Sequence, residues 1–145
     1  MTENVKVYLI NSGEWVLNEE TNTKFKVFTS PKNWSEARSY CQSLNADLAS
    51  VSDKRTNDFL TELTNSTAWI GGYLHDDNSW KWSNGRSFSF QNWYPGNPDN
   101  KGGMQDKILI NHKIVGKWDD VGAFVKRNYI CETLGNMILP YGKLN

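Results

Sequence analysis

The segment from Phe88 to Gln105 has neither the period of a helix nor the alternation of a strand, and it is rich in Gly, Pro and Asn. The chain has 145 residues, which is the size of one domain. Long loops without regular structure are uncommon inside a compact domain, and those that occur are usually functional. The sequence therefore predicts a domain whose regular elements hold one long functional loop.

The elements predicted around this loop form an α+β pattern. Apolar residues at three- and four-residue spacing predict a helix over Trp34–Leu44, with Ser30 as its cap and Pro31 at its first position. Ser52 is expected to cap a second helix over Asp53–Thr64. Short apolar or alternating runs predict strands or extended segments at Val5–Ile10, Lys24–Phe28, Asp47–Val51, Ala68–Tyr73, Trp80–Trp82, Lys107–Asn111, Gly116–Trp118 and Asn128–Glu132.

Composition and motifs exclude several classes of function. The chain has 16 basic and 16 acidic residues and no basic cluster, so we expect no nucleic-acid partner. No apolar segment is long enough to span a membrane. No serine-hydrolase signature, metalloprotease helix or phosphate-binding loop is present, which indicates a protein that is not an enzyme. Seven Trp residues indicate a core held together by aromatic side chains.

Only two cysteines occur in the chain, Cys41 and Cys131. A disulfide between them would close a loop of about 90 residues, which contributes roughly 4.5 kcal/mol in the chain-entropy model. Two buried free thiols are the alternative. Neither cysteine has a Cys or His partner at ligand spacing, so the pair does not indicate a zinc site.

Oxygen-bearing side chains gather in and just after the loop. Asn97 and Asp99 flank Pro98, Gln105 follows, and the adjacent carboxylates Asp119-Asp120 come after a short apolar run. Several side-chain oxygens on a stiff backbone suit a hard cation such as calcium. A cation with an incompletely filled coordination sphere can also hold the hydroxyl groups of a ligand. The simpler alternative for Asp119-Asp120 is a turn cap.

The chain resembles the C-type lectin-like domain family over roughly residues 24–134. The matching motifs are Trp34-Ser35-Glu36-Ala37-Arg38 leading to Cys41, Asp47-Leu48-Ala49-Ser50-Val51, Ala68-Trp69-Ile70-Gly71-Gly72, Trp80-Lys81-Trp82-Ser83-Asn84-Gly85, Asn92-Trp93, Gly116-Lys117-Trp118-Asp119-Asp120 and Tyr129-Ile130-Cys131-Glu132. The resemblance implies two helices packed on short antiparallel sheets, with a long loop that carries the binding site. Residues 1–23 are then an N-terminal strand extension, and residues 135–145 are a C-terminal tail.

The resemblance also implies a disulfide between Cys41 and Cys131, and calcium in the long loop. Family members that bind sugar draw their calcium ligands from an acid-Pro-amide or amide-Pro-acid triplet, a later acid and a final Asn-Asp pair. Pro98 of the triplet is typically cis in such members. Carried over by position, the expected metal ligands are Asn97, Asp99, Gln105, Asp119 and Asp120.

The sequence departs from the family pattern at three ligands and at one disulfide. Asn97 is one methylene shorter than the usual Glu or Gln, Gln105 replaces a carboxylate, and Asp119 replaces an amide. Three carboxylates remain, which suffices for a divalent cation. The second disulfide, which braces the loop in the family, is absent, and its positions hold Lys107 and Ala123. The loop is therefore expected to be more disordered without calcium.

The order of amide and acid in the triplet bears on the choice of sugar. A carboxylate only accepts hydrogen bonds, whereas an amide can donate or accept them. Family members with the amide first resemble galactose binders, and Asn97-Pro98-Asp99 has that order. The residues expected to bind sugar are Asn97, Asp99, Gln105 and Asp119, with Trp93 or Tyr94 as an aromatic platform and packing in the core as the alternative for Trp93.

These features lead to the hypothesis of a calcium-dependent, galactose-type lectin. A calcium-independent module that binds protein or a surface polymer, ice among the possibilities, is the alternative. Val5–Ile10 and the tail from Thr133 are possible homodimer contacts. Two glycosylation acceptor triplets, Asn33-Trp34-Ser35 and Asn65-Ser66-Thr67, favour a secreted protein, although residues 1–10 contain no signal peptide.

Overall fold

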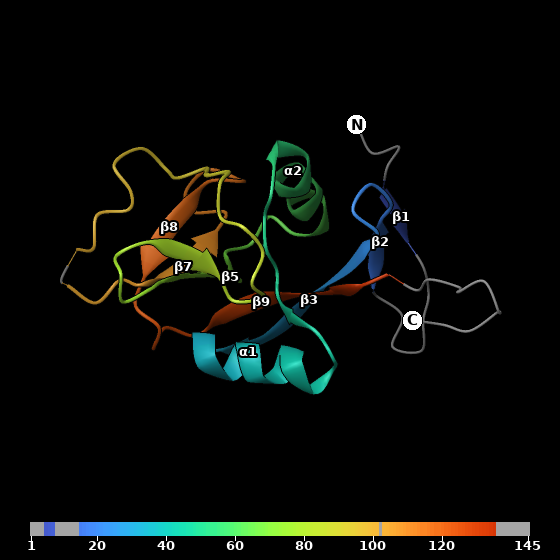
Figure 1. The fold of residues 1–145 in the computed structure, drawn as a ribbon, viewed down its shortest axis with the longest axis horizontal. Coiled ribbons are helices and arrows are strands. Elements are labelled where there is room, and N and C mark those ends of the chain that lie inside the picture. The colour runs from blue at the N-terminus through green and yellow to red at the C-terminus, as the bar shows by residue number, and fades with distance from the viewer. Residues whose placement is uncertain (1–4, 8–14, 102, 136–145) are drawn as a thin grey trace.

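The computed structural model describes residues 5–7, 15–101 and 103–135. Its helices and strands in chain order are β1 (Val5–Val7), β2 (Val16–Asn18), β3 (Thr23–Lys32), α1 (Trp34–Ser43), β4 (Asp47–Leu48), α2 (Lys54–Leu63), β5 (Ala68–Leu74), β6 (Trp80–Trp82), β7 (Lys107–Ile110), β8 (Trp118–Val121) and β9 (Arg127–Leu134). The predicted α+β fold is confirmed, with α1 and α2 on opposite sides of β3 and β9 (Figure 1).

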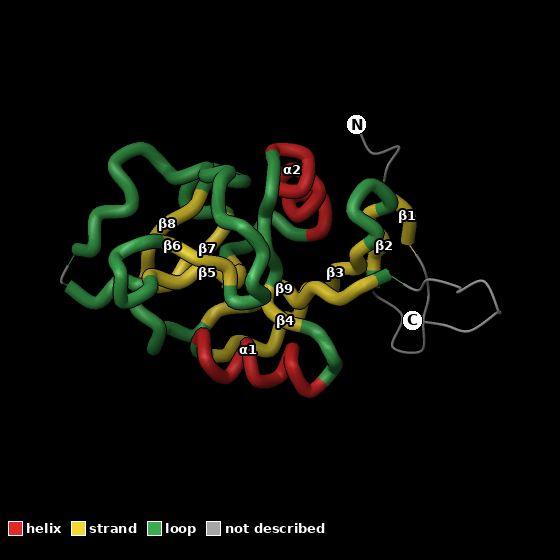
Figure 2. Tube along the Cα trace, in the orientation of Figure 1, coloured by secondary structure: helices red, strands yellow, loops and turns green. Residues whose placement is uncertain are grey.

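The described strands join in one nine-stranded sheet of order β1-β2-β3-β9-β5-β7-β8, with β4 beside β9 and β6 beside β5. Every pair is antiparallel except β5 and β9, which run parallel where Ala68 and Trp69 face Asn128 and Tyr129. This parallel pair joins the half of the sheet that contains β1 to β3 to the half beside the long loop (Figure 2). The sequence predicted antiparallel sheets and did not reveal this junction, because its two strands are far apart in the chain.

Alternate residues of the central strands enter two separate cores. Ile130 of β9 lies in a core with Phe59 and Leu60 of α2, whereas its neighbours Tyr129 and Cys131 lie in a core with residues of α1. Successive side chains of a strand point to opposite faces of the sheet. Each helix therefore covers one face.

Aromatic residues from the start of the long loop extend the core on the α2 side. Phe88, Phe90 and Trp93 pack against that core, next to the fully buried Trp118 of β8. The loop begins at the edge of the sheet and returns to β7, as Figure 2 shows in green. Its first part is therefore anchored by aromatic packing, which leaves the part after Trp93 to form a surface.

The predicted start of helix α1 at Trp34 is confirmed, but its cap is not the predicted one. Its cap is Asn33, whose side chain accepts a hydrogen bond from the Glu36 backbone N–H at 2.9 Å, while Glu36 Oε1 accepts one from the Asn33 N–H at 3.2 Å. This reciprocal capping box satisfies two backbone donors. Ser30 and Pro31, the predicted cap and first residue, instead belong to β3.

The second helix and the first strand also differ from their predictions. The cap of α2 is Asp53 rather than Ser52, because the Asp53 carboxylate accepts a hydrogen bond from the Thr56 N–H at 2.8 Å. Strand β1 covers Val5–Val7, and the rest of the predicted strand Val5–Ile10 lies outside the described residues. The tail from residue 136 also lies outside them.

The predicted disulfide is confirmed. Cys41 of α1 and Cys131 of β9 are bonded, with an S–S distance of 2.05 Å, and both residues are fully buried. The bridge closes a loop of 90 residues that contains α2 and strands β4 to β8. It ties α1 to the strand on which β3, β4 and β5 all pair.

Replacing both Cys41 and Cys131 by Ala should lower the free energy of unfolding by about 2–5 kcal/mol, because the open chain regains the entropy that the bridge removes. Urea denaturation followed by circular dichroism measures this loss. The oxidised wild type treated with reductant serves as a second route to the same open chain. A loss below about 1 kcal/mol by both routes would contradict the role given to the bridge.

Candidate functional site

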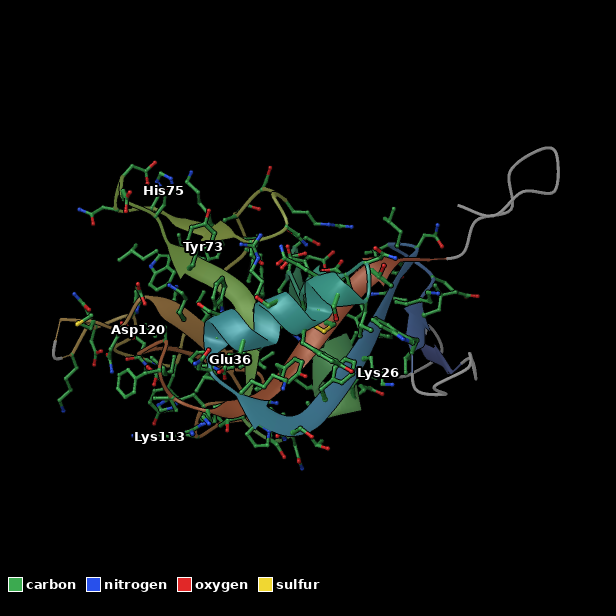
Figure 3. All side chains as sticks on the ribbon, turned by 90° about the horizontal axis from the view of Figure 1, so that it is seen from below. Lys26, Glu36, Tyr73, His75, Lys113 and Asp120 are labelled. Carbon is green, nitrogen blue, oxygen red and sulfur yellow. A yellow bond between two sulfur atoms is a disulfide. The ribbon has the colours of Figure 1, made fainter. Side chains whose placement is uncertain are left out.

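The long loop and the hairpin between β7 and β8 enclose a cavity of about 310 Å³. Three segments line it: the part of the loop just after Trp93, the end of the loop before β7, and the hairpin with the start of β8. The lining residues are Tyr94, Pro95, Gly96, Asn97, Asp99, Lys101, Gln105, His112, Lys113 and Asp119. Figure 3 shows Lys113 and Asp120 toward the same end of the molecule, away from Lys26. The cavity therefore lies at the loop end of the domain.

Four of the five predicted ligands line this one cavity: Asn97, Asp99, Gln105 and Asp119. The peptide bond between Asn97 and Pro98 is cis, as the resemblance implied. The fifth predicted ligand, Asp120, is fully buried beside the loop. The fold thus brings together oxygens that are about twenty residues apart in the sequence.

The carboxylate of Asp120 holds the loop on β8. Its Oδ1 accepts a hydrogen bond from the Asp99 N–H at 3.1 Å, and its Oδ2 accepts one from the Asn100 N–H at 2.6 Å. Each carboxylate oxygen can accept more than one hydrogen bond. Asp120 therefore keeps acceptor capacity while it positions the backbone that carries Asp99.

A second set of hydrogen bonds closes the loop on itself. The Lys101 N–H is shared between Asp99 Oδ1 at 3.1 Å and Gln105 Oε1 at 2.8 Å. The Asn100 side-chain oxygen accepts a hydrogen bond from the Gln105 N–H at 3.0 Å. These contacts bring the side chain of Gln105 beside that of Asp99. At position 105 the expected family pattern has a carboxylate.

Trp34 contacts Lys107 and Ala123, the two residues expected at the positions of the family's second disulfide. The ammonium group of Lys107 lies 4.9 Å from the centre of the Trp34 ring, and the Ala123 carbonyl accepts a hydrogen bond from the Trp34 backbone N–H at 3.0 Å. The Trp34 indole N–H donates to the Ile70 carbonyl at 3.0 Å. Non-covalent contacts to α1 therefore restrain the two segments that a cystine would join.

Asp119 sits in a crowded, partly buried position. Burial raises the pKa of its carboxyl, and the neighbouring carboxylates Asp120 and Asp99 raise it as well, while His112 acts in the opposite direction. The His112 Nδ1 lies 3.4 Å from Asp119 Oδ2. Like charges held this close favour a bound cation, which would offset their repulsion.

The oxygens that line the cavity come from carboxylates and from amides. Within the described residues, no three His, Cys, Asp or Glu side chains are grouped as a metal site would require. A cation in the cavity would therefore also depend on the amide oxygens of Asn97 and Gln105. Calcium accepts carboxylate and amide oxygens alike, so the chemistry of the lining fits that ion.

The structure separates the two predicted aromatic platforms. Trp93 packs against Trp80 and Trp118, with ring centres 5.0 and 5.7 Å apart, and it does not line the cavity. Tyr94 does line it, in edge contact with His112 at 5.1 Å. Of the two, only Tyr94 is therefore placed to contact a ligand in this cavity.

Three basic residues of the cavity were not among the predicted site residues: Lys101, His112 and Lys113. The hairpin pairing of Ile110 with Trp118 brings His112 and Lys113 beside Asp119. The two strands of this hairpin were predicted, so their turn could have been placed beside the carboxylates from sequence. The position of Lys101 depends on how the loop closes, which no sequence pattern indicated.

Comparisons with known proteins give a consistent result. Residues 30–133 match the family described as Lectin C-type domain. A lectin of Pleurodeles waltl is 36% identical over 120 residues, which cover 77% of this chain and 70% of that protein. The chain spans no more than 56% of the length of three other curated relatives.

Two solved structures share the fold. The carbohydrate-recognition domain of cow CD23, determined in the presence of a GlcNAc2Man3 oligosaccharide, has a TM-score of 0.78 and 22% identity, covering 91% of this chain and all of that one. A calcium-independent type II antifreeze protein also has a TM-score of 0.78, with 18% identity, covering 89% of this chain and 96% of that one.

No helix in the described ranges is long and apolar enough to cross a membrane. The match over residues 30–133 and the shared fold together show that the chain belongs to the C-type lectin domain family, whose members are carbohydrate-binding proteins and not enzymes.

Proposed function

We propose that this domain is a calcium-dependent lectin that binds sugar hydroxyl groups in the cavity beside the long loop. The observation that carries the proposal is the convergence of Asn97, Asp99, Gln105 and Asp119 on that one cavity. Calcium would be held by these residues with Asp120, and it would supply a hard centre that accepts hydroxyl oxygens of a sugar.

The side chains around the cation would set the orientation of the sugar. Asp99 and Asp119 can only accept hydrogen bonds from hydroxyl groups, whereas Asn97 and Gln105 can also donate them. The amide of Asn97 precedes the acid of Asp99, which is the order that resembles galactose binders. We therefore propose galactose as the preferred neutral sugar, with Tyr94 of the cavity lining as its aromatic platform.

Single sites of this open kind bind weakly. A monosaccharide affinity in the millimolar range corresponds to about −4 kcal/mol. Useful affinity would then come from several sites that act together, as in a homodimer. The Cys41–Cys131 disulfide supports an extracellular location, because such bonds persist mainly in oxidising compartments.

A calcium-independent binding module is the second candidate, and one observation favours it. Both oxygens of Asp120 accept backbone hydrogen bonds, and Gln105 and Asp99 share the Lys101 N–H, so the loop is organised by its own groups. The similarity of fold to a calcium-independent antifreeze protein is consistent with this candidate.

Calcium should stabilise the wild type. At one hundred times the dissociation constant it adds about 2.7 kcal/mol, which raises the melting temperature by roughly 5–10 °C for a chain of this size. Asp119→Ala should reduce the shift strongly, because it removes both a ligand oxygen and a charge from the cavity. The matched control is Asp58→Ala, at an exposed acid that pairs with Lys54 on α2. Melting curves in calcium and in chelator give the result.

Asp119 is preferred to Asp120 for this experiment because Asp120 also positions the loop, so its loss would have two effects. A wild-type melting temperature that is the same in 10 mM calcium and in chelator would rule out the calcium site. Ligand binding that persists in chelator would then support the second candidate.

Exchanging the two ends of the triplet, Asn97→Asp with Asp99→Asn, should shift preference from galactose toward mannose. The exchange keeps the charge and composition of the cavity while it interchanges the accepting and donating side chains. The Asn at 99 still offers an oxygen to the Lys101 N–H, as Asp99 does now. Competition by each sugar for a galactose matrix, with calcium present, measures the shift. An unchanged order of competition would contradict the galactose proposal.

A further inference from the structure

We propose that the sugar taken by this cavity carries a negative charge, so that the natural ligand is an acidic glycan with a carboxylate or sulfate group. Lys113 and Lys101 would bind the anionic group, with His112 beside them. The inference rests on the proposed sugar-binding function of the same cavity and specifies the class of its ligand.

The charge balance of the cavity carries the first step. Lys101 and Lys113 both line it, and neither forms an ion pair with any other residue that the structure describes. The carboxylates of Asp99, Asp119 and Asp120 would be largely offset by a divalent cation. The two ammonium groups then exceed the remaining negative charge, so a bound ligand would meet a net positive surface.

The second step is the position of Lys113. Its ammonium group lies 5.4 Å from the centre of the Tyr94 ring, and Tyr94 also lines the cavity. The contact places the charge over an aromatic ring at the edge of the site. A ligand whose hydroxyl groups face Asp99 and Asp119 would therefore have its outer substituents near Lys113.

The hairpin that carries Lys113 is held firmly. The buried Asn111 accepts a hydrogen bond from the Gly116 N–H at 2.8 Å and donates to the carbonyls of Thr64 and Ser66 at 3.0 and 2.9 Å. The Gly116 carbonyl accepts further bonds from the Asn57 and Asn92 amides. The charge of Lys113 is thus presented on a rigid turn.

The backbone at Lys113 gives an independent indication. Its φ is +60°, in the left-handed region that Gly and Asn occupy more easily than Lys. Residues kept in such conformations cluster at functional sites. A lysine at this position is not favoured by the turn, which is consistent with a need for its side chain.

The experiment compares three sugars with the full chain in calcium: galactose, galacturonic acid and galactose 6-sulfate. Isothermal titration or competition for a galactose matrix gives their relative affinities. Both acidic sugars should bind at least fivefold more tightly than galactose at low salt, and the advantage should shrink at 0.5 M salt. The sulfate distinguishes recognition by lysine from direct binding of a sugar carboxylate to calcium.

Variants assign the effect to the lysines. Lys113→Gln and Lys101→Gln should each reduce the advantage of the acidic sugars and leave galactose unchanged, whereas Lys113→Arg should keep the advantage. Lys126→Gln is the matched control, because Lys126 is also exposed and lies outside this cavity. Lys113→Gly should weaken the acidic sugars without lowering the melting temperature.

The outcomes separate the two proposals. Equal binding of galactose and both acidic sugars would overturn the acidic ligand and leave the lectin function intact. The same would follow if Lys126→Gln reduced the advantage as much as Lys113→Gln. Binding of none of the three sugars, at concentrations up to 50 mM, would overturn both proposals. If the acidic sugars still bind more tightly than galactose in chelator, the acidic ligand stands and calcium is not required.

Discussion

The hydrogen bonds that the buried carboxylate of Asp120 accepts from the Asp99 and Asn100 backbone decide where the binding loop lies. Trp93 is the last residue of the loop that packs in the core, and the Tyr94 N–H after it still donates to the Trp118 carbonyl at 2.8 Å. Asp120 holds the next part of the loop against β8, and its two hydrogen bonds keep Asp99 near Asp119. A charged group buried without partners is costly, so the loop and the carboxylate stabilise each other.

The sheet and the helices bring Asp120 to that position. Strand β8 pairs with β7, β7 with β5, and β5 runs parallel to β9, which is bonded to α1 through Cys131. Trp118, just before Asp119, donates its indole N–H to the buried Asn57 of α2 at 2.8 Å. Two of the predicted ligands, Asp119 and Asp120, thus lie on a strand that the core holds in place. The other three lie on the loop, which that strand holds in turn.

Much of this arrangement could be predicted from sequence, because it depends on local patterns. Periodicity located both helices and the central strands, and the resemblance to a family supplied the pairing of Cys41 with Cys131 and the cis bond before Pro98. The caps of the two helices were missed although the signals were present. Asn33 and Glu36 form a capping box, but Ser30 followed by Pro31 offered a competing start just upstream.

The features that could not be predicted depend on contacts between distant residues. The parallel pairing of β5 with β9 and the packing of Trp93 against Trp80 leave no mark in a local window. The contacts of Trp34 with Lys107 and Ala123 are equally non-local. The basic residues of the cavity were missed because their placement depends on how the loop and the hairpin converge. Those residues bear on the proposed ligand, since two lysines beside the proposed calcium site would favour an acidic sugar over a neutral one.

The most direct test of the account is a crystal structure of the chain grown with calcium and galactose. That structure should contain one calcium ion in the cavity, with side-chain oxygens of Asn97, Asp99, Gln105, Asp119 and Asp120 at about 2.3–2.6 Å and sugar hydroxyl oxygens completing its coordination. A well-ordered cavity that contains no ion at saturating calcium, with the loop held only by Asp120 and the Lys101 N–H, would contradict it.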